Sequence, residues 1–443
     1  MHSRTGVILW VRAGLLAGVL GGVPAVGHAQ FVSGRLTTPV AGEEFVAGAQ
    51  DAAISPDGGI VAFVSSSTNI GVPANGSLNV YLYDLFADSY FLAMDGLGSG
   101  NSSAPSVATG GAAVAFESLA DNIGGGTPSG FADVFYSAAF DAGGGSVGFV
   151  TVQVSNGLGG AAPNDASRFA SVSADGRWVA WWSAASNLVA GDSNGAPDIF
   201  IADAQDAFAS PQRASVTGSG AQIAGPSRAL SPNALSADGR LLVFAVDTPV
   251  SLDGSDAGTL EDVFVRDRIA GTTQLVSKST AGAAGNSSSD QPAISPNGRY
   301  VAFRSFSSNL VAGASGSRIY LRDRQAGATS NMPLPPAAQN CEEPRVSNGG
   351  DIVVQCNMSA GPQQVFLYRA TEGGVFYQLS TDTGGGDGDN TSGNATGISA
   401  DGNFLTFDSA ATDLVADDAN ETTDVFIVVD LVALNAIFAD GFE

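Results

Sequence analysis

Two loops of the chain carry oxygen-bearing side chains at a spacing that suits a hard cation. Both follow an Asp-x-Asn-x-x-x-Asp pattern, with Asp192, Asn194 and Asp198 in one loop and Asp418, Asn420 and Asp424 in the other. Three such oxygens, completed by backbone carbonyls or water, would form the ligand shell of a calcium ion. The alternative is a series of Asx turns, in which Asp and Asn accept hydrogen bonds from their own backbone. Ca²⁺ is therefore the one cofactor that we consider.

Histidine chemistry is excluded by where the histidines lie. The chain has 2 of them, His2 and His28, and both fall in residues 1–29, which read as a secretory signal. Basic residues precede an apolar run over 13–23, and small residues up to Ala29 then mark a cleavage position. The alternative is an uncleaved N-terminal anchor. We expect an exported chain, periplasmic or extracellular, with no His left for a catalytic triad, a zinc site or a general base.

The two cysteines, Cys341 and Cys356, flank a predicted hairpin. With a two-residue turn at Asn348-Gly349 they face each other across the two strands, within reach of a disulfide. A single pair in an exported chain favours the bond. The alternative is two reduced, buried thiols.

Charge and hydropathy limit the partners. The chain has 18 Lys and Arg residues against 43 Asp and Glu residues, for a net charge of −25, and 44% of its residues are hydrophobic. Such a surface repels phosphate backbones and anionic lipid, so nucleic-acid binding is not expected. After the signal, no apolar stretch reaches the ~20 residues of a membrane span.

A repeated phrase supplies the elements that hold these residues. It consists of an apolar residue, Ser, two residues and Gly, followed by a β-rich run that ends in an aromatic residue, as in Ile54 to Phe63. In one degenerate copy, Gln355 takes the place of the aromatic residue. The aligned glycines, 52 to 65 residues apart, are Gly58, Gly111, Gly176, Gly239, Gly298, Gly350 and Gly402. Each interval is long enough for four strands with loops.

The predicted fold is an all-β, seven-bladed β-propeller of four-stranded antiparallel blades. The second and third strands of each unit are apolar on both faces, which suits sheets covered by neighbours on both sides. No fourth-strand phrase follows Asp430, so we expect residues 31–38 to supply the outer strand of the last blade. The predicted domains are a signal over 1–29, a propeller over 30–430 and a short tail over 431–443.

The phrases Ser-x-Asp-Gly-Arg/Asn, as at Ser173 to Arg177, and Asn-Leu-Val-Ala-Gly-Asp, as at Asn187 to Asp192, resemble the WD40-like repeats of bacterial TolB-like β-propellers. The resemblance covers roughly residues 31–430. It implies the propeller fold and leaves the function open, because propellers serve many functions.

The variable residues around the entry of the central channel are the candidates for a ligand face: Arg168, Asp290, Glu342, Glu343, Arg345 and Asn394. Six of the seven units have a small residue on the innermost strand where Arg345 stands, so we expect Arg345 to reach into the channel. Solvated loop residues would explain this variation equally well.

Three functions remain open. The first, which we favour, is a non-enzymatic binding module for a protein, peptide or glycan. The second is a calcium-stabilised structural or cell-surface protein. The third is a carbohydrate-active enzyme that uses paired carboxylates, although no catalytic residue can be singled out.

Overall fold

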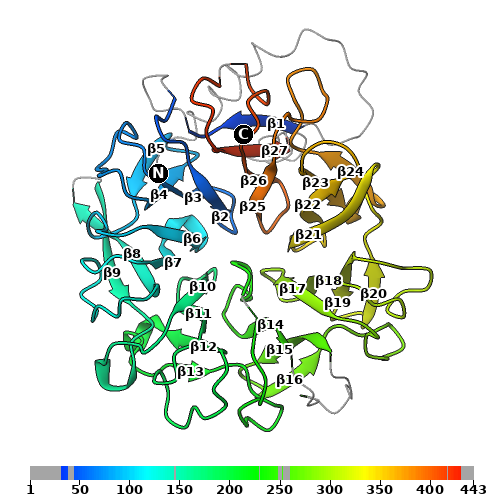
Figure 1. Ribbon diagram of the computed structural model, residues 1–443, viewed down its shortest axis with the longest axis horizontal. Helices are drawn as coiled ribbons and strands as arrows, with labels where there is room; N and C mark the ends of the chain where they lie inside the picture. Colours follow the sequence, from blue (N-terminus) through cyan, green and yellow to red (C-terminus); the bar gives the residue numbers. More distant parts are fainter. Residues whose placement is uncertain are drawn as a thin grey trace, which may run out of the picture.

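Seven antiparallel sheets are arranged around a central axis in a computed structural model of the chain (Figure 1). The structure describes residues 31–37, 44–143, 146–228, 230–247, 252, 260–416 and 418–430. Within them the predicted seven-bladed propeller is confirmed. The predicted signal over 1–29 and tail over 431–443 lie outside the described residues. No helix in the described part of the chain is long and apolar enough to cross a membrane.

Blades 1 to 6 run outward from the axis in chain order. Blade 1 consists of β2 (Gln50–Ile54), β3 (Ile60–Ser65), β4 (Asn79–Asp84) and β5 (Ser89–Leu92). Blade 2 consists of β6 (Ser102–Val107), β7 (Ala113–Ser118), β8 (Asp133–Gly143) and β9 (Ser146–Gln153). Blade 3 consists of β10 (Ser167–Val172), β11 (Trp178–Ser183), β12 (Asp198–Asp203) and β13 (Gln212–Arg213). Short 3₁₀ turns are η1 (Thr109–Gly111), η2 (Leu158–Gly160), η3 (Ala204–Asp206) and η4 (Ala370–Glu372).

The remaining blades continue the pattern. Blades 4 to 7 consist of β14 (Leu241–Asp247), β15 (Glu261–Asp267) and β16 (Thr272–Leu275); β17 (Ser289–Ile294), β18 (Tyr300–Ser305), β19 (Arg318–Asp323) and β20 (Ala328–Asn331); β21 (Ala338–Val346), β22 (Ile352–Met358), β23 (Gln364–Arg369) and β24 (Val375–Gln378); and β25 (Ser392–Ile398), β26 (Phe404–Ser409), β27 (Asp424–Asp430) and β1 (Phe31–Arg35). The inner strand of blade 4 is reduced to the isolated bridges Ser227↔Val246 and Leu235↔Leu242.

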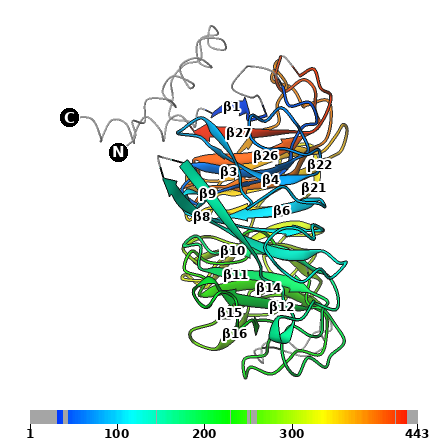
Figure 2. The same ribbon diagram turned by 90° about the vertical axis from the view of Figure 1, so that its left-hand side faces the viewer.

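The ring is closed by the two ends of the described chain. Strand β1 pairs antiparallel with β27, from Phe31 opposite Asp430 to Arg35 opposite Phe426. The two strands lie side by side in both views (Figures 1 and 2). The predicted outer strand of blade 7 is thus confirmed, and it protects an edge that would otherwise stay unpaired.

The core lies between the blades. Every residue of β3 and of β7 is buried, although adjacent residues point to opposite faces of the sheet. An aromatic pair joins the second and third strands in six blades, with ring centroids 5.3 to 6.4 Å apart: Phe63–Tyr81, Phe116–Phe135, Trp181–Phe200, Phe244–Phe264, Phe303–Tyr320 and Phe407–Phe426. Each buried ring contributes several kcal/mol of hydrophobic stabilisation, of the order of 1.5–3 for a large side chain.

Blade 6 corrects one expectation. The residue in its aromatic column is Val354, which pairs with Phe366, and the prediction that Gln355 stands there is wrong. The turn of this blade is one residue shorter after its glycine, because Ser347 N donates to Asp351 O, whereas Ser55 N donates to Ile60 O in blade 1. Relative to the other blades, this deletion shifts the residues of β22 by one position, so that Val354 lies where they have an aromatic residue.

The aligned glycines occupy the first turn of each blade. All seven have a positive φ, between 65° and 89°, which L side chains rarely adopt. At Gly239 a Cβ would also lie 2.3 Å from the Trp178 ring of the preceding blade. The serine of the repeated phrase stabilises the turn. Ser236 Oγ, for example, accepts a hydrogen bond from Leu241 N (2.9 Å) and donates one to Asp238 Oδ1 (2.7 Å).

These turns are joined into a ring around the axis. Backbone bonds link Thr109 N to Ala174 O (3.0 Å), Asp175 N to Ala237 O (3.1 Å), Ala237 N to Pro296 O (2.7 Å), Asn348 N to Ala400 O (2.8 Å) and Ala400 N to Pro56 O (2.7 Å). Pro56 and Pro296 have no N–H to donate. Side chains make those two links instead, from Gly110 N to Asp57 (3.2 Å) and from Asn297 N to Asn348 (2.7 Å).

The predicted disulfide between Cys341 and Cys356 is present, with the two Cα atoms 4.0 Å apart. The two residues pair as predicted although the turn holds three residues, because a bulge between Glu342 and Arg345 restores the register. In four other blades the same inner pair is two serines whose hydroxyls are 2.7 to 3.0 Å apart: Ser102–Ser118, Ser167–Ser183, Ser289–Ser305 and Ser392–Ser409. The disulfide therefore replaces a hydrogen bond of the repeat.

Replacing Gly239 with Ala should destabilise the fold by about 2–4 kcal/mol, because it combines an unfavourable φ with overpacking against Trp178. Gly191→Ala is the matched control: Gly191 also has a positive φ, of 74°, but nothing lies near its missing Cβ. That control should lose only about 1 kcal/mol. Urea unfolding midpoints measure both, and equal losses would contradict the role assigned to Trp178.

Replacing both cysteines with Ser should cost less stability than replacing both with Ala. Either change removes a short disulfide-closed loop, at the lower end of ~2–4 kcal/mol. The serine pair should recover about 1 kcal/mol through the hydroxyl hydrogen bond that other blades use. Thermal unfolding of the two double variants tests this, with the reduced wild-type chain as reference; identical melting temperatures for the two would refute it.

Candidate functional site

A cavity of about 560 Å³ lies on the axis of the ring. About half of its wall is apolar, and that part comes largely from residues next to the first turns: Ile54, Val107, Val172, Leu235, Ile294 and Ile398. The turn residues Pro56, Ala174, Ala237 and Pro296 border one end. Charged and polar side chains gather at the other end, which we call the mouth.

The mouth is built by β-bulges on six innermost strands. In five of these bulges one non-glycine residue has a φ between 48° and 57°: Asp51, Ala104, Phe169, Gln291 and Glu343. All five line the cavity. A bulge turns a side chain away from the regular pleat, and a left-handed residue costs roughly 1–3 kcal/mol. The fold therefore holds strain in the same position of five blades.

Hydrogen bonds connect neighbouring bulges. Ala104 N donates to Asp51 Oδ2 (2.9 Å), and Glu343 N donates to Gln291 Oε1 (3.0 Å). Burial raises the pKa of Asp51, and the Ala104 N–H partly offsets this. Sequence reasoning missed the bulges, although a proline follows the strained residue in three blades (Pro105, Pro292 and Pro344), and proline inside a strand is typical of bulges.

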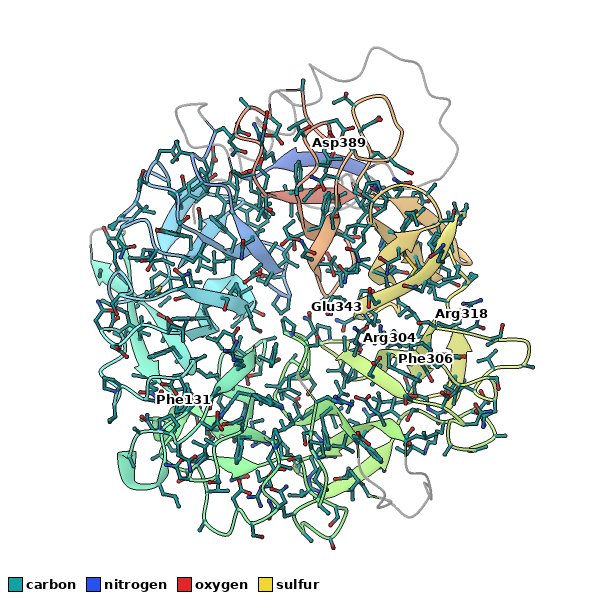
Figure 3. All side chains as sticks on the ribbon, viewed as in Figure 1. Phe131, Arg304, Phe306, Arg318, Glu343 and Asp389 are labelled. Carbon is teal, nitrogen blue, oxygen red and sulfur yellow. A yellow bond between two sulfur atoms is a disulfide. The ribbon has the colours of Figure 1, made fainter. Side chains whose placement is uncertain are left out.

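The structure brings together four of the six predicted ligand-face residues. Asp290, Glu343, Arg345 and Asn394 line the cavity, and Figure 3 places Glu343 at the inner edge of the ring. Arg345 lines the channel, as its position in the repeat predicts.

The other two candidates, Arg168 and Glu342, lie on the same inner strands next to the bulges but are not among the residues that line the cavity. Arg168 is exposed. Glu342 accepts a bond from Arg304 Nη1 (2.9 Å), and Arg304 also binds Asp290 through two bonds of 2.6 and 2.8 Å. Arg304 and its two acids therefore form one ionic cluster beside the mouth.

Blade 4 changes the shape of the channel. In place of a regular inner strand, Pro232 O accepts hydrogen bonds from Ser106 Oγ (3.0 Å) and Ser171 Oγ (2.9 Å), and Asn233 O accepts one from Ile294 N (2.9 Å). The inner segment of blade 4 is thus bonded to blades 2, 3 and 5. The expectation that blade 4 has the same inner strand as the others is corrected here.

Two further charged residues of the mouth, Arg228 and Glu261, escaped the sequence analysis. Glu261 starts β15, yet it lines the cavity because blade 4 lacks a regular inner strand. Arg228 Nε lies 2.9 Å from Glu261 Oε1. Burial raises the pKa of Glu261, and Arg228 opposes that shift.

The first candidate metal loop, in blade 3, is organised around an arginine. Arg213 lies 3.3 Å from Asp192 Oδ1 and 2.8 Å from Asp198 Oδ2. The side-chain oxygen of Asn194 accepts a hydrogen bond from Ala196 N (3.1 Å), which is the hydrogen bond of an Asx turn. The loop brings its two aspartates together around a guanidinium, with the Asn oxygen bonded within its own turn.

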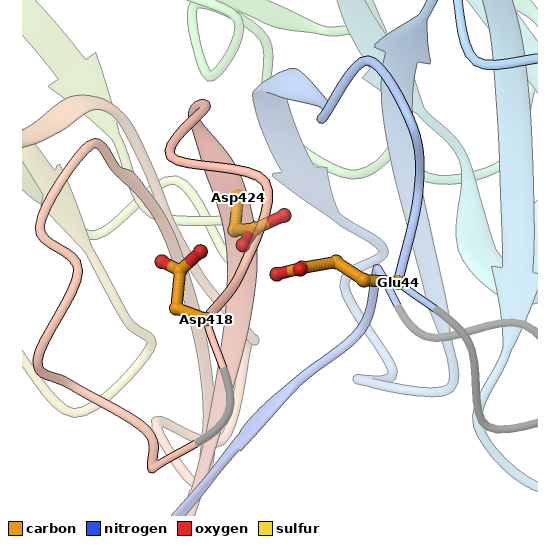
Figure 4. A group of neighbouring side chains, drawn as sticks. All are labelled: Glu44, Asp418 and Asp424. Atoms are coloured by element: carbon orange, nitrogen blue, oxygen red, sulfur yellow. The ribbon is translucent and has the colours of Figure 1, made fainter.

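The second loop, in blade 7, gathers Asp418 and Asp424 with Glu44, whose carboxylate oxygens lie within 4.8 Å of one another (Figure 4). The third residue of the predicted set, Asn420, bonds backbone groups: its Oδ1 accepts a hydrogen bond from Thr422 N (2.8 Å), and its Nδ2 donates one to Phe45 O (2.7 Å). Sequence reasoning missed Glu44, because only ring closure brings it beside residues near the other end of the chain.

An arginine again lies among these acids. Arg35 Nη1 hydrogen-bonds Glu44 and lies 3.3 Å from Asp424 Oδ2 and 3.8 Å from Asp418 Oδ1. Arg35 faces Phe426 across blade 7 as Arg213 faces Phe200 across blade 3. The two loops are therefore equivalent sites, each with a guanidinium between its carboxylates.

The pH dependence of stability between about pH 4 and 6 should come partly from Asp424. Burial raises its pKa to about 6, against the opposing effects of Thr37 and Arg35. Because this lies above the ~3.9 of an unfolded aspartate, protonation favours the folded chain, and that contribution is lost as the pH rises through the folded-state pKa.

Asp424→Asn should therefore flatten the stability curve between about pH 4 and 6. The control is Asp389→Asn, because hydrogen bonds from Thr412 lower the pKa of Asp389, so that it titrates below this range. Urea unfolding across the pH range measures the effect. Parallel curves for the wild type and Asp424→Asn would contradict it.

No protein-family model matches the chain, and no curated protein matches its sequence. Many solved structures share its fold. An oligogalacturonate lyase from Vibrio parahaemolyticus is 14% identical, with 92% of this chain and 98% of that one covered and a TM-score of 0.50. The β-propeller domain of the trilobed protease from Pyrococcus furiosus is 9% identical, with coverages of 87% and 93% and a TM-score of 0.50.

A structure assigned as TolB from Agrobacterium tumefaciens is 15% identical, with coverages of 75% and 90% and a TM-score of 0.39. At identities this low, the similarity to the lyase and to the protease domain shows a shared fold alone, and no activity follows from it. The chain is a seven-bladed β-propeller, in agreement with the TolB-like, WD40-like repeats that its sequence resembles.

Proposed function

We propose that the protein is an exported, non-enzymatic binding module whose ligand, a protein segment, peptide or glycan, enters the mouth of the axial cavity. The observation that carries this proposal is the ring of strained bulge residues that line the mouth. Strain of this kind is typical of sites where side chains must be aimed at a ligand. A cavity of about 560 Å³ is also within the usual size range of ligand sites.

The contrast between the two ends of the channel supports the same proposal. Around the turns, all seven blades have a glycine with positive φ at the same position, and hydrogen bonds link each turn to the next. At the mouth, the five bulge residues are of five different types. A repeat that varies more at one end is expected where that end recognises an asymmetric ligand.

The charges of the mouth favour binding over catalysis. Each acidic residue that lines the cavity has a partner: Asp51 accepts Ala104 N, Glu261 pairs with Arg228, Asp290 with Arg304 and Glu343 with Arg345. A glycosidase-type mechanism would need one carboxylate as an acid and a second as a base or nucleophile. In the two candidate calcium loops a guanidinium already lies among the acids, which does not favour the calcium-stabilised alternative.

Export is the second half of the proposal. Its support is the Cys341–Cys356 disulfide, since such bonds persist mainly in oxidising compartments. We infer a periplasmic or extracellular location, with a signal over 1–29 as the means of reaching it.

Arrays of peptides and glycans, probed with the full chain, test the function. Asn394→Trp places a bulky ring at the mouth, where Asn394 is exposed and lines the cavity. It should weaken binding of any captured ligand by about tenfold or more. The matched control is Ala209→Trp, since Ala209 is equally exposed but lies in the turn after η3.

Equal binding by Asn394→Trp and the wild type would refute the location of the site. Turnover of any array member would refute the non-enzymatic assignment, and binding to no member of either array would count against the function as a whole.

A further inference from the structure

We propose that Arg345 makes the axial cavity a receptor for the free C-terminal carboxylate of a peptide or protein segment. The inference deepens the function proposed above and rests on it. It depends on three features: an arginine at a position that is small elsewhere, a guanidinium edge with a free donor, and the charges and apolar wall around it.

The position of Arg345 on β21 distinguishes blade 6 from the others. The corresponding inner-strand residues are Ala53, Ser106, Ser171, Ala234, Ala293 and Gly397. Small residues there let the innermost strands converge on the axis. Arg345 breaks this pattern, lines the cavity and has only 6% of its side chain exposed. Burying a charge is costly unless that charge is paired.

The guanidinium of Arg345 is held on one side and incompletely bonded on the other. Nη1 donates to the carbonyls of Glu343 (3.2 Å) and Pro344 (3.1 Å), which fixes the plane of the group. On the opposite edge, Nη2 reaches Glu343 Oε2 at 3.2 Å, and Nε has no hydrogen-bond partner among the described residues. Nε and Nη2 together form the two-pronged edge that binds a carboxylate through two parallel bonds.

The Glu343 side chain is a weak competitor for this edge. It makes a single bond to Arg345, and 40% of it is exposed. A ligand carboxylate that bonds both Nε and Nη2 would replace one long bond with two and would leave Glu343 free in water at the mouth. Thr396 on β25 of the next blade also lines the cavity, and its buried Oγ1 is likewise without a partner in the described part of the chain.

The surroundings favour a peptide terminus over an acidic glycan. Toward the turns, the cavity wall beyond Arg345 is aliphatic, which suits the side chain of an apolar last residue. Sugar hydroxyls would find few partners there and would lose their hydration. Toward the mouth lie four acids, Asp51, Glu261, Asp290 and Glu343. They repel a polyanion but accept a peptide that carries basic residues before its terminus.

Fluorescence anisotropy with the full chain tests the inference. The probes are short labelled peptides with Lys or Arg in the middle and Val, Leu or Ile at a free C-terminus, and the same peptides ending in an amide. A labelled oligouronate is the third probe. We expect the free acids to bind at least about tenfold more tightly than the amides, which corresponds to the loss of a charge-assisted hydrogen-bond pair.

Arg345→Gln should reduce the affinity for the free acids to that for the amides, and Arg345→Lys should restore part of it. The matched control is Arg318→Gln, because Arg318 lies on β19, toward the outside of the ring in Figure 3, where its Nη1 bonds Ser317 O. That variant should bind like the wild type. The comparison of acid with amide on the wild-type chain needs no variant, so it holds even if Arg345→Gln does not fold.

Equal binding of acids and amides, still blocked by Asn394→Trp, would overturn the role of Arg345 and leave the proposed function intact. Arg345-dependent binding of the oligouronate alone would overturn the peptide assignment. Binding of none of the three probes would also overturn the inference, and the arrays described above would then decide separately whether the mouth binds any other ligand.

Discussion

The apolar character of both faces of each blade is the constraint on which this structure depends. A middle strand such as β3, with all of its residues buried, is stable only when another sheet covers each side. No blade can meet that condition alone, so the sheets must form a closed ring. Closure then requires the pairing of β1 with β27, which joins residues almost four hundred positions apart.

The axis of the ring has its own requirements, and they differ between its two ends. At one end the turns are held together by a circle of hydrogen bonds, and glycine with positive φ is needed in every blade. Where proline removes a backbone donor, a side chain of the same turn makes the link. At the other end six strands bulge, and the strained residues of five of them line the mouth. One end therefore stabilises the ring, and the other end is available for recognition.

Charge is distributed in keeping with this division. Inside the blades, arginines such as Arg35 and Arg213 lie on the outermost strand, in equivalent positions among carboxylates. A guanidinium there lowers the cost of desolvating the buried acids. Arg345 is different, because its buried guanidinium has one donor without a partner among the described residues, and Arg345 lines a cavity. The same residue type thus stabilises the blades in one place and supports the binding proposal in another.

The number of blades, the strand that closes the ring and the disulfide could all be predicted from the sequence, because each follows from local and periodic signals. Glycine marks a turn with positive φ, and a two-sided apolar strand marks a sheet covered on both faces. The repeat also predicted that Arg345 would reach the channel, since only blade 6 lacks a small residue there.

The residues that make up the sites could be identified only once the chain was seen folded. Glu44 joins Asp418 and Asp424 through ring closure, and Arg35 lies among them although nothing in the loop pattern indicates it. The bulges and the irregular inner segment of blade 4, which exposes Glu261 to the axis, also went unpredicted. The physical reason is that a repeat pattern reports the environment that all blades share. A site depends on contacts between different blades, which have no fixed spacing along the chain.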